Sequence, residues 1–379
     1  MDGLGGLPIV ENGPTELEAA DTPNLDALAR AGICGLHHPI GPGITPGSGP
    51  AHMALFGYDP IASNIGRGVL EALGVDFDLR PEDIAARGNF ATMNRRGIIT
   101  DRRAGRISSE QSTKLCDLLN GMPLDGVRVF VRLVREHRFL AVFRDSRLTA
   151  DLTDSDPQRD GLAPKPIEAL NEQAVRAAAV ANRFVAEANA RLAGRRMANT
   201  VLLRGFSQHP RLPTMQERYL LQPAAIAAYP MYRGLAKLAG MEVLPTGPDP
   251  ADEFEALSQY WSEHDFFFLH VKKTDAAGED GDFERKVRAI EEVDALVPRL
   301  MALGPDVVVV TGDHSTPAAL RGHSWHPVPV LLWSHRCRAD GVVEFSERAC
   351  RAGGLGRFPA VDIMPLALAN ALKLGKFGA

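Results

Sequence analysis

The chain has 379 residues, of which 45% are hydrophobic and 23% charged, and its formal net charge is −5. This length allows about two or three domains, and the composition is ordinary for a soluble globular protein. The small negative charge argues against nucleic acid or an anionic membrane surface as a partner. The sequence has no run of about 18 apolar residues, so no membrane span is predicted.

The cysteines indicate a reducing compartment. There are four, Cys34, Cys116, Cys337 and Cys350, and no two of them form a CxxC pair. Scattered cysteines of this kind are typical of free thiols rather than of a disulfide framework. The first residues do not have the pattern of a signal peptide. We therefore expect a cytoplasmic protein, and the sequence leaves its oligomeric state open.

The chain opens with an Asp-Gly turn and then a helix. "DGLGG" (2–6) is the kind of turn that follows a buried strand, but only Met1 precedes it. We therefore expect the natural chain to begin upstream of Met1. "TPNLDALARAG" (22–32) predicts a helix, with Thr22 as its N-cap, Pro23 at its first position and Gly32 after its end.

Ser48 lies in an unusual segment, "PGITPGSGPAHMALFGYDP" (42–60). Glycines and prolines surround the serine, and an apolar stretch follows, so a short helix beginning at Ser48 is predicted. The serine can be the cap of that helix or a nucleophile. His52 lies one helical turn further on and faces the same way.

The middle of the chain differs from both ends. The segments 83–93 and 97–108 read as strands joined by a short connection, and 127–145 reads as further strand with a reversal near Glu136-His137. A polar loop (153–166), an Ala-rich helix (roughly 167–193) and a strand (199–207) follow. This order predicts an α+β domain, roughly 73–211, inserted into a domain formed by 1–72 and 212–379.

The last part of the chain predicts an α/β domain. The runs 265–275 and 306–317 are apolar and end in polar residues, as buried parallel strands do, and 326–334 is a plausible neighbouring strand. A helix is predicted over 280–303, where apolar residues recur three or four apart. We expect a mostly parallel sheet flanked by helices.

Chemically reactive side chains follow these strands. In open α/β sheets, ligands bind beyond the carboxyl ends of the strands, and there the sequence places Lys272, Lys273, Asp275, Glu279, Asp313, His314, His323 and, if a strand precedes it, Asp2. Carboxylates and histidines of this kind bind divalent metals. Taken singly, each has an ordinary explanation, such as a solvated turn for "GDH" or an exposed helix start for Asp275 and Glu279.

Long motifs carry a family resemblance. They include "DGLGG" (2–6), "TPNLDALARAG" (22–32), residues 42–60, "GRGVLEALGV" (66–75), "DRRAGRIS" (101–108), "HVKKTDAAGEDGDFERKVRAIEEVD" (270–294), "TGDHSTP" (311–317), "GHSWHPVPVLL" (322–332) and residues 350–372. With these, the chain resembles the archaeal-type cofactor-independent phosphoglycerate mutases of the alkaline phosphatase superfamily. The match extends almost end to end.

The resemblance implies two-metal phosphoryl transfer. Ser48 would take the phosphoryl group of 3-phosphoglycerate, and its return to the other hydroxyl would give 2-phosphoglycerate. One metal site would use Asp2, Ser48, Asp313 and His314, and the other Asp275, Glu279 and His323. The metals are expected to be manganese, with magnesium also possible. Metal coordination lowers the pKa of a serine hydroxyl and stabilises phosphoryl oxygens.

The substrate, a small phosphorylated hydroxy acid, needs cations. Arg67, Arg102, Arg103 and Arg106 are candidates, because guanidinium groups pair bidentately with phosphate and carboxylate. An interdomain salt bridge or a solvated face would explain them equally well. Asp101 would orient an arginine or transfer a proton, and Lys272 or Lys273 would neutralise phosphoryl charge. His52 would contact the substrate or pack against its helix.

Four departures separate this chain from the family pattern. Glu279 stands where the family has histidine, Gly49-Pro50 replaces Asp-Thr after the serine, and Gly6 replaces aspartate. The family also has a strand before Asp2. The changes at 279 and 49–50 leave open a metal-dependent phosphohydrolase, or a mutase for a related phosphorylated or phosphonylated hydroxy acid. The lost leader leaves open a non-catalytic homologue.

Overall fold

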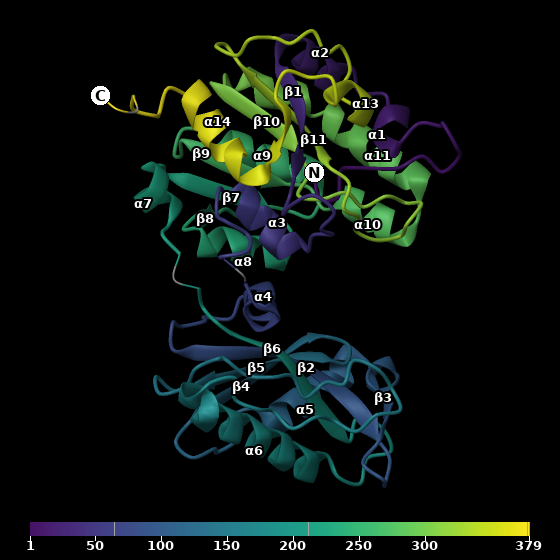
Figure 1. Cartoon of the computed structure of the whole chain (residues 1–379), viewed down its shortest axis with the longest axis vertical. Coiled ribbons are helices and arrows are strands. Elements are labelled where there is room, and N and C mark those ends of the chain that lie inside the picture. Colours follow the sequence, from purple (N-terminus) through teal and green to yellow (C-terminus); the bar gives the residue numbers. More distant parts are fainter. Residues whose placement is uncertain (64, 211, 377, 379) are drawn as a thin grey trace. The chain divides into compact units, whose positions relative to one another are not determined.

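The computed structural model describes residues 1–63, 65–210, 212–376 and 378, and the chain folds into two compact units (Figure 1). Unit 1 comprises Met1–Asn64 and Leu212–Ala379, and unit 2 comprises Ile65–Arg211. The first crossing lies at residues 64–65 rather than at 72–73, because helix α4 (Arg67–Gly74) packs on strands of unit 2. No helix within the described ranges combines the length and apolarity that crossing a bilayer requires.

The strands of unit 1 form two sheets, ordered β10-β11-β1-β12 and β8-β7-β9. Three pairings are parallel, whereas β11 runs antiparallel to both of its neighbours. The strands are β1 (Ile33–His38), β7 (Pro223–Ala227), β8 (Glu242–Val243), β9 (Phe266–His270), β10 (Val307–Thr311), β11 (Val328–Ser334) and β12 (Gly356–Pro359).

Helices cover both faces of the larger sheet. Leu331 of β11 packs into a core with Leu25 and Leu28, whereas Val330 packs with Ala54 and Ile363 on the other side. Adjacent strand residues face opposite ways, so this division follows from the pleat. The helices of unit 1 are α1 (Glu16–Ala19), α2 (Pro23–Ala31), α3 (Ser48–Leu55), α7 (Met215–Tyr219), α8 (Pro230–Leu238), α9 (Pro250–Tyr260), α10 (Lys273–Asp280), α11 (Phe283–Asp294), α12 (Val297–Ala302), α13 (Glu347–Cys350), the 3-10 helix η3 (Ala360–Asp362) and α14 (Ile363–Asn370). The predicted α/β class is confirmed, but the strands form two sheets rather than one, and β10, predicted to be a parallel strand, pairs antiparallel with β11.

Two helix predictions need correction. The segment 280–303 forms two helices, α11 and α12, because Pro298 at the start of α12 cannot continue the α11 ladder. Thr22 stands at the N-cap position of α2 but makes no cap hydrogen bond. The Asp294 carboxylate accepts from the backbone N–H of Asn24 (3.1 Å) and Leu25 (2.7 Å) instead, so α11 caps α2.

The N-terminal residues connect the two sheets of unit 1. The Met1 amino group donates to the carbonyl of Thr311 (2.9 Å), and the Asp2 N–H donates to the carbonyl of Val271 (2.9 Å). Thr311 ends β10 and Val271 follows β9. Asp2 is therefore held between the carboxyl ends of these two strands, and it is buried.

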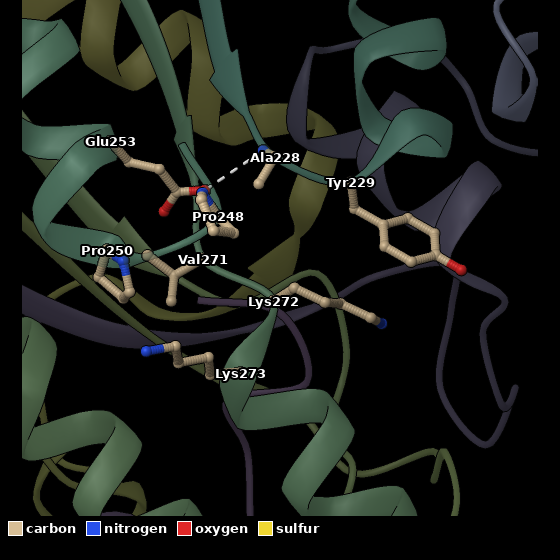
Figure 2. Close-up of a pocket in the computed structure, with 8 residues that line it drawn as sticks. All are labelled: Ala228, Tyr229, Pro248, Pro250, Glu253, Val271, Lys272 and Lys273. Carbon is tan, nitrogen blue, oxygen red and sulfur yellow. Dashed lines mark hydrogen bonds between the residues drawn. The ribbon is translucent and has the colours of Figure 1, made fainter. Parts of the chain in front are cut away.

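A buried acid lies behind the ends of β7 and β9. Glu253 of α9 is 2% exposed, and its Oε1 accepts from the Ala228 N–H (3.3 Å), as Figure 2 shows. It lines a cavity of about 240 Å³ together with Tyr229, Lys272 and Lys273 (Figure 2). Burial raises the pKa of Glu253 from 4.5 to about 8, against the opposing pull of the Met1 amino group and Lys273.

Unit 2 is an antiparallel sheet with helices. The order is β3-β2-β5-β4, and β6 also pairs with β2. Besides α4, its elements are β2 (Asp83–Met93), β3 (Ile99–Asp101), the 3-10 helix η1 (Ala104–Arg106), α5 (Ser109–Leu119), β4 (Arg128–Arg135), β5 (Arg138–Arg144), the 3-10 helix η2 (Glu172–Ala174), α6 (Val175–Leu192) and β6 (Thr200–Gln208).

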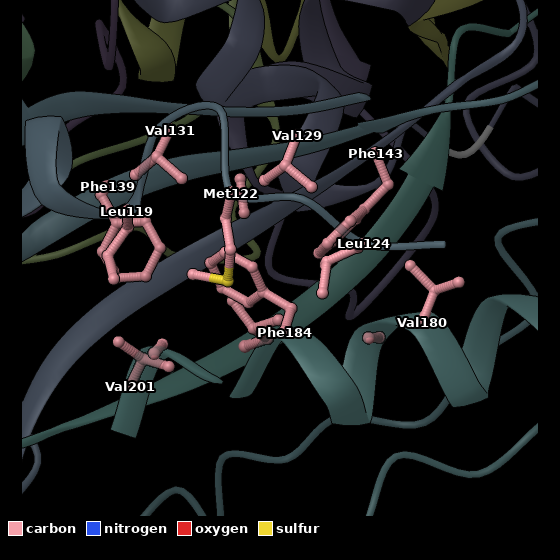
Figure 3. Packing of buried hydrophobic residues seen from close by; sticks show 14 of the residues in the cluster. Leu119, Met122, Leu124, Val129, Val131, Phe139, Phe143, Val180, Phe184 and Val201 are labelled. Atoms are coloured by element: carbon pink, nitrogen blue, oxygen red, sulfur yellow. The ribbon is translucent and has the colours of Figure 1, made fainter. Parts of the chain in front are cut away.

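The main core of unit 2 lies between the sheet and helices α5 and α6. Phe139 and Phe143 of β5 point into it (Figure 3), and the Phe143 ring packs edge-on against Phe184 of α6. Leu140 and Val142, on the opposite face of the same strand, pack with Ala72 of α4. Strand β5 is thus covered on both faces, which explains why its sequence is apolar at nearly every position.

Two elements predicted in unit 2 are shorter in the structure than the sequence indicated. The predicted strand 97–108 is extended only at β3, because Gly105, with φ = 66°, bends the following segment into η1. The predicted long helix begins at η2 and α6 rather than at 167, since the Asn171 side chain accepts from the Ala174 N–H and starts the helical segment there. The reversal at Glu136-His137 is as predicted.

The pKa of Glu253 gives a stability prediction. Between pH 4.5 and 8 the folded state keeps a proton that the unfolded state loses, so the stability contribution of Glu253 is present below pH 4.5 and is lost as the pH rises. We expect Glu253→Gln to be more stable than wild type at pH 8.5, with a difference that grows by up to about 1.4 kcal/mol per pH unit in this window. Urea unfolding at pH 5 and 8.5 measures it, with exposed Glu255→Gln as control. An equal difference at both pH values would contradict the assignment.

Candidate active site

Acidic and histidine side chains converge at one edge of unit 1. Asp2 follows the N-terminus, Asp275 lies in the first turn of α10, Asp313 and His314 follow β10, and His323 lies in the loop before β11. The first four are at most 1% exposed. Because the carboxyl ends of β9 and β10 point to this edge, segments distant in the sequence deliver their side chains to one place.

These side chains form two groups that share His314. Asp275, His314 and His323 form one group, and Asp2, Asp313 and His314 form the other. Within each group, one ligand atom from every residue lies within 4.8 Å of the others. Carboxylate oxygens and imidazole nitrogens suit zinc and manganese alike, so either group is chemically able to hold a divalent ion.

The hydrogen bonds of His314 orient its ring. Thr316 Oγ1 donates to Asp275 Oδ1 (2.6 Å), so its oxygen accepts from His314 Nδ1 (2.9 Å). Nε2 of the neutral ring is then a lone pair, which faces Asp2 Oδ1 (3.4 Å) and Asp313 Oδ2 (3.1 Å). Burial lowers the pKa of His314, but the Asp313 carboxylate outweighs burial and holds the pKa above its usual value.

His323 is oriented in the same way. Its Nδ1 donates to the carbonyl of Pro46 (2.9 Å), which leaves a lone pair on Nε2. That nitrogen lies 3.7 Å from Asp275 Oδ1. The rings of His314 and His323 stack with 3.6 Å between their centroids. Both imidazoles therefore direct a free nitrogen at carboxylates, as metal-ligating histidines do.

Ser48 reaches this cluster from helix α3. It is the first residue of the helix, and Gly47 rather than Ser48 is the N-cap. Its hydroxyl lies 3.1 Å from His314 Nε2. Pro50 is tolerated here because the first turn of a helix has unpaired N–H groups in any case. The reading of Ser48 as a cap is thus wrong, and its hydroxyl faces the acidic cluster.

His52 lies beneath Ser48 and is 1% exposed. Its Nδ1 donates to the Ser48 carbonyl (2.8 Å) and lies 3.2 Å from Asp313 Oδ2. The ring packs against Phe268 and Tyr232. In this arrangement His52 supports Ser48 and Asp313 from within the core.

Lys272 is the cation of the cluster. Its Nζ donates to Asp2 Oδ2 (2.9 Å) and to Asp275 Oδ2, and thereby joins two buried carboxylates. Burial and the Asp313 charge raise the pKa of Asp2, but His270 and Lys272 outweigh them and hold it at about 2. Lys273 instead pairs with Glu292 (3.0 Å) and Asp249 (2.9 Å), away from these carboxylates.

Glu279 lies at the margin of the cluster. Its side chain is 54% exposed, and Oε1 is 3.9 Å from His323 Nε2. Neither three-residue group includes it. Its neighbours are already engaged, since Asp280 pairs with Arg285 (2.8 Å) and Asp282 caps α11.

Three residues of the cluster were not predicted. His270, which ends β9, donates from Nε2 to Asp2 Oδ2 (3.2 Å), because an ionised carboxylate can only accept, and burial lowers the pKa of His270 to about 4. Tyr232 stacks on His270 with 3.7 Å between centroids and contacts Lys272 Nζ through its hydroxyl (3.0 Å). Thr316 links Asp275 to His314. His270 and Thr316 lie inside motifs already noted, and His270 also ends a strand, so the sequence offered a signal for both, whereas Tyr232 gave none.

Glycines allow the loops to approach each other. Gly3 has φ = 61°, and a Cβ there would lie 2.5 Å from Thr316 Oγ1 and 2.7 Å from Asp275 Oδ1. No other residue fits without displacing the cluster. At Gly6 a Cβ would collide with the Glu16 carboxylate, which gives a steric reason for glycine where the family pattern has aspartate.

Unit 2, taken by itself, carries the predicted arginines, not all of which are free. Arg102 donates from Nε and Nη2 to both oxygens of buried Asp156 (2.8 and 2.6 Å), so it forms an ion pair within unit 2. Asp101 accepts from the N–H groups of Arg103 and Gly105 and thereby shapes the turn. The side chains of Arg67, Arg103 and Arg106 are exposed.

A further arginine of unit 2 was missed. Arg204 of β6 is half-buried, and its Nε has no hydrogen-bond partner among the described residues. Burial, together with Arg87 and Arg67, lowers its pKa, while Asp156 lies 3.9 Å from Nε. A cluster of cations with one unsatisfied donor can bind an anion.

The fold and this edge define an α/β enzyme whose acidic and histidine residues surround a serine at a helix start. Comparison with known proteins identifies the family. The sequence model described as 2,3-bisphosphoglycerate-independent phosphoglycerate mutase matches residues 29–197. A probable 2,3-bisphosphoglycerate-independent phosphoglycerate mutase of Thermus thermophilus is 50% identical over 384 residues, covering 100% of this chain and 95% of that protein. The chain belongs to this family, as the motifs predicted.

Solved structures agree. A protein from Pyrococcus horikoshii has a TM-score of 0.83 and 29% identity, with 100% of this chain and 97% of that one covered. The cofactor-independent phosphoglycerate mutase from Thermoplasma acidophilum has a TM-score of 0.76 and 31% identity, with 98% of each chain covered. The similarity thus extends over both units.

Lys272 gives a prediction for the metal-free protein. Removing one partner of a buried ion pair leaves the other charge uncompensated, so Lys272→Met should destabilise the protein by about 3 kcal/mol. This value is at the lower end for buried ion pairs, because 27% of the lysine side chain is exposed. Lys273→Met, which breaks only surface pairs, should cost less than about 1 kcal/mol. Urea unfolding in the presence of a chelator compares the two. Equal losses would show that Lys272 is not the counter-ion of the cluster.

Proposed function

We propose that this protein interconverts 3-phosphoglycerate and 2-phosphoglycerate through a phosphoserine on Ser48, at a site for two divalent metal ions. The observation that supports this most directly is the Ser48 hydroxyl, 3.1 Å from His314 Nε2, where the two acid–histidine groups meet. The family and the names of its members support the substrate.

The residues present fit a pair of metals. Asp2 Oδ1 and Asp313 Oδ2 are buried and lack a hydrogen-bond partner among the described residues, which is costly unless a cation or donor joins them. We assign Asp2, Ser48, Asp313 and His314 to one ion, and Asp275, His323 and Glu279 to the other, with His314 close to both. Hard oxygen ligands favour manganese or magnesium. Bound ions supply Lewis-acid stabilisation of the serine alkoxide and the phosphoryl oxygens.

The side chains of the chain perform the remaining tasks. Ser48 Oγ forms a bond to phosphorus as the bond to O3 of the glycerate breaks, and the return of the group to O2 restores the serine. The proton that Ser48 releases balances the one that O3 gains. Thr316 and Pro46 hold the two imidazoles with their lone pairs toward the carboxylates. His52 fixes the backbone carbonyl of Ser48.

We assign substrate binding to the cations of unit 2 and, separately, charge neutralisation at the metal ligands to a lysine of unit 1. Arg67, Arg103, Arg106 and Arg204 suit the phosphate and carboxylate of the substrate, with Arg102 and Asp101 shaping their surroundings. Lys272 neutralises charge beside the metal ligands. Lys273 remains a weaker candidate, because it is engaged with Glu292 and Asp249. Unit 2 is thus the substrate-binding domain and unit 1 the metal-binding domain. The reaction belongs to glycolysis and gluconeogenesis, which would place it in the cytoplasm.

One observation favours a second function. Glu279, in place of the family's histidine, is more than half exposed and stands away from the compact groups. A loosely held second ion beside an open margin would admit water to the phosphoserine and make the enzyme a phosphohydrolase. An assay with 3-phosphoglycerate and Mn²⁺, without 2,3-bisphosphoglycerate, separates the two. A mutase yields 2-phosphoglycerate, a hydrolase yields free phosphate, and no turnover would contradict both.

Ser48→Ala tests the nucleophile. Loss of the attacking oxygen should lower kcat by at least about 10³-fold. Because Gly47 is the N-cap, the stability of the variant should stay within about 0.5 kcal/mol of wild type. Activity and urea unfolding are measured together, and the phosphoprotein trapped by acid quench should disappear. Near-normal turnover by Ser48→Ala would refute the phosphoserine route.

Glu279 tests the second metal. A carboxylate is harder than imidazole, so Glu279→His should raise affinity for Zn²⁺ or Co²⁺ relative to Mg²⁺, and Glu279→Ala should lose one ion. Metal content after dialysis, together with activity, measures both effects. Asp280→Ala is the matched control, since Asp280 is exposed and paired with Arg285. Two ions retained at unchanged affinity by Glu279→Ala would exclude Glu279 as a ligand.

A further inference from the structure

Lys286 is a fully buried lysine beneath the acidic cluster. It lies on α11, and its side chain is 0% exposed. Its Nζ donates to the carbonyl oxygens of Gly5 (2.9 Å) and Thr316 (2.9 Å). The nearest carboxylate, Glu16 Oε1, is 3.9 Å away. A buried ammonium is expensive unless it is hydrogen bonded and compensated, so these contacts need an explanation.

The two carbonyls belong to the two segments that carry the cluster. Gly5 lies three residues after Asp2, and Thr316 lies two residues after His314. The Thr316 N–H also donates to Gly5 O (3.0 Å), and its hydroxyl donates to Asp275. Lys286 therefore fastens the segment of Asp2 to the segment of His314 at the point where both pass Asp275.

The carboxylates around Lys286 hold the same segments. Glu16 accepts from the N–H groups of Leu7 (3.1 Å) and Ala318 (2.7 Å), one in each segment. Glu347 accepts from the Gly6 N–H (2.8 Å) and the Thr15 hydroxyl (2.6 Å). Each of the two segments is thus held through its backbone by buried Glu16, and the Asp2 segment also by half-buried Glu347; neither residue is part of the acidic cluster.

We propose that Lys286 is a positioning residue that sets the separation of Asp2 from Asp275 and His314, and thereby the affinity of the site for divalent ions. This inference rests on the proposed metal site. Lys286 forms no hydrogen bond with a carboxylate of the cluster, and its direct contacts with the two segments are the carbonyls of Gly5 and Thr316. Residues that orient metal ligands typically change metal affinity by about 10–100-fold when they are replaced.

The alternative is that Lys286 only stabilises the fold, by compensating Glu16. A pair of variants separates the two. Lys286→Met removes the donors and leaves Glu16 without a cation, whereas Lys286→Met combined with Glu16→Gln removes both charges. Because Glu16 also accepts from Leu7 and Ala318, Glu16→Gln alone is the reference for the double variant. A purely structural role predicts that the double variant recovers stability and metal affinity together. A positioning role predicts that it recovers stability alone.

The experiment is Mn²⁺ titration by calorimetry on chelator-treated protein, with melting curves of the metal-free forms. We expect about 10–100-fold weaker Mn²⁺ binding by Lys286→Met and by the double variant, with the melting temperature restored only in the double variant. Arg285→Met is the matched control, because Arg285 precedes Lys286 on α11 and pairs with exposed Asp280. It should bind Mn²⁺ like wild type.

Each other outcome is decisive. Wild-type affinity in the double variant, or in a folded Lys286→Met protein, overturns the positioning role while the metal site stands. If Lys286→Met does not fold, the double variant alone decides. Wild-type protein that binds no Mn²⁺ overturns the proposed metal site, and this inference with it.

Discussion

Three buried carboxylates in one cluster are the constraint on which the rest of unit 1 depends. Asp2, Asp275 and Asp313 are each 1% exposed, and their mutual repulsion would separate them unless cations and donors compensated it. In the metal-free protein, Lys272 joins two of them, His52 lies beside the third, and Gly3 donates its N–H to Asp313 (3.1 Å). A site that needs this much compensation is suited to multivalent cations.

The surrounding structure fixes the geometry of these ligands. The Thr316 hydroxyl fixes the tautomer of His314, and the Pro46 carbonyl fixes that of His323. The absence of a side chain at Gly3 lets the N-terminal loop approach Asp275. Beneath these loops, Lys286 and Glu16 hold the backbone rather than the ligands. Burying such charges costs free energy, but a fully hydrogen-bonded buried network holds the ligands in one arrangement rather than several. Ser48 enters this frame from the start of α3, where the first N–H groups of the helix have no intrahelical partner.

The two units contribute different chemistry. Unit 1 has strand ends that gather acids and histidines, whereas the antiparallel sheet of unit 2 has arginines on and beside its strands, of which Arg102 is paired with Asp156 and Arg204 keeps a free donor among the described residues. In the proposed reaction, phosphoryl transfer needs charge stabilisation and the anionic groups of the substrate need cations. Both units are shared with relatives that the chain matches almost end to end.

The sequence by itself determined the α/β class, the strands over β9, β10 and β11, the family, and which residue types follow the strand ends, because apolar periodicity and motif spacing are local properties of the chain. Only the tertiary structure decided that Asp294 caps α2 and that His314 belongs to both acid–histidine groups. It also decided that Arg102 is already paired with Asp156, and that His270, Tyr232 and Lys286 support the ligands. These contacts join residues far apart in the chain, such as Asp2 with Lys272 and Gly5 with Lys286. They depend on how packed segments meet, which no local pattern specifies.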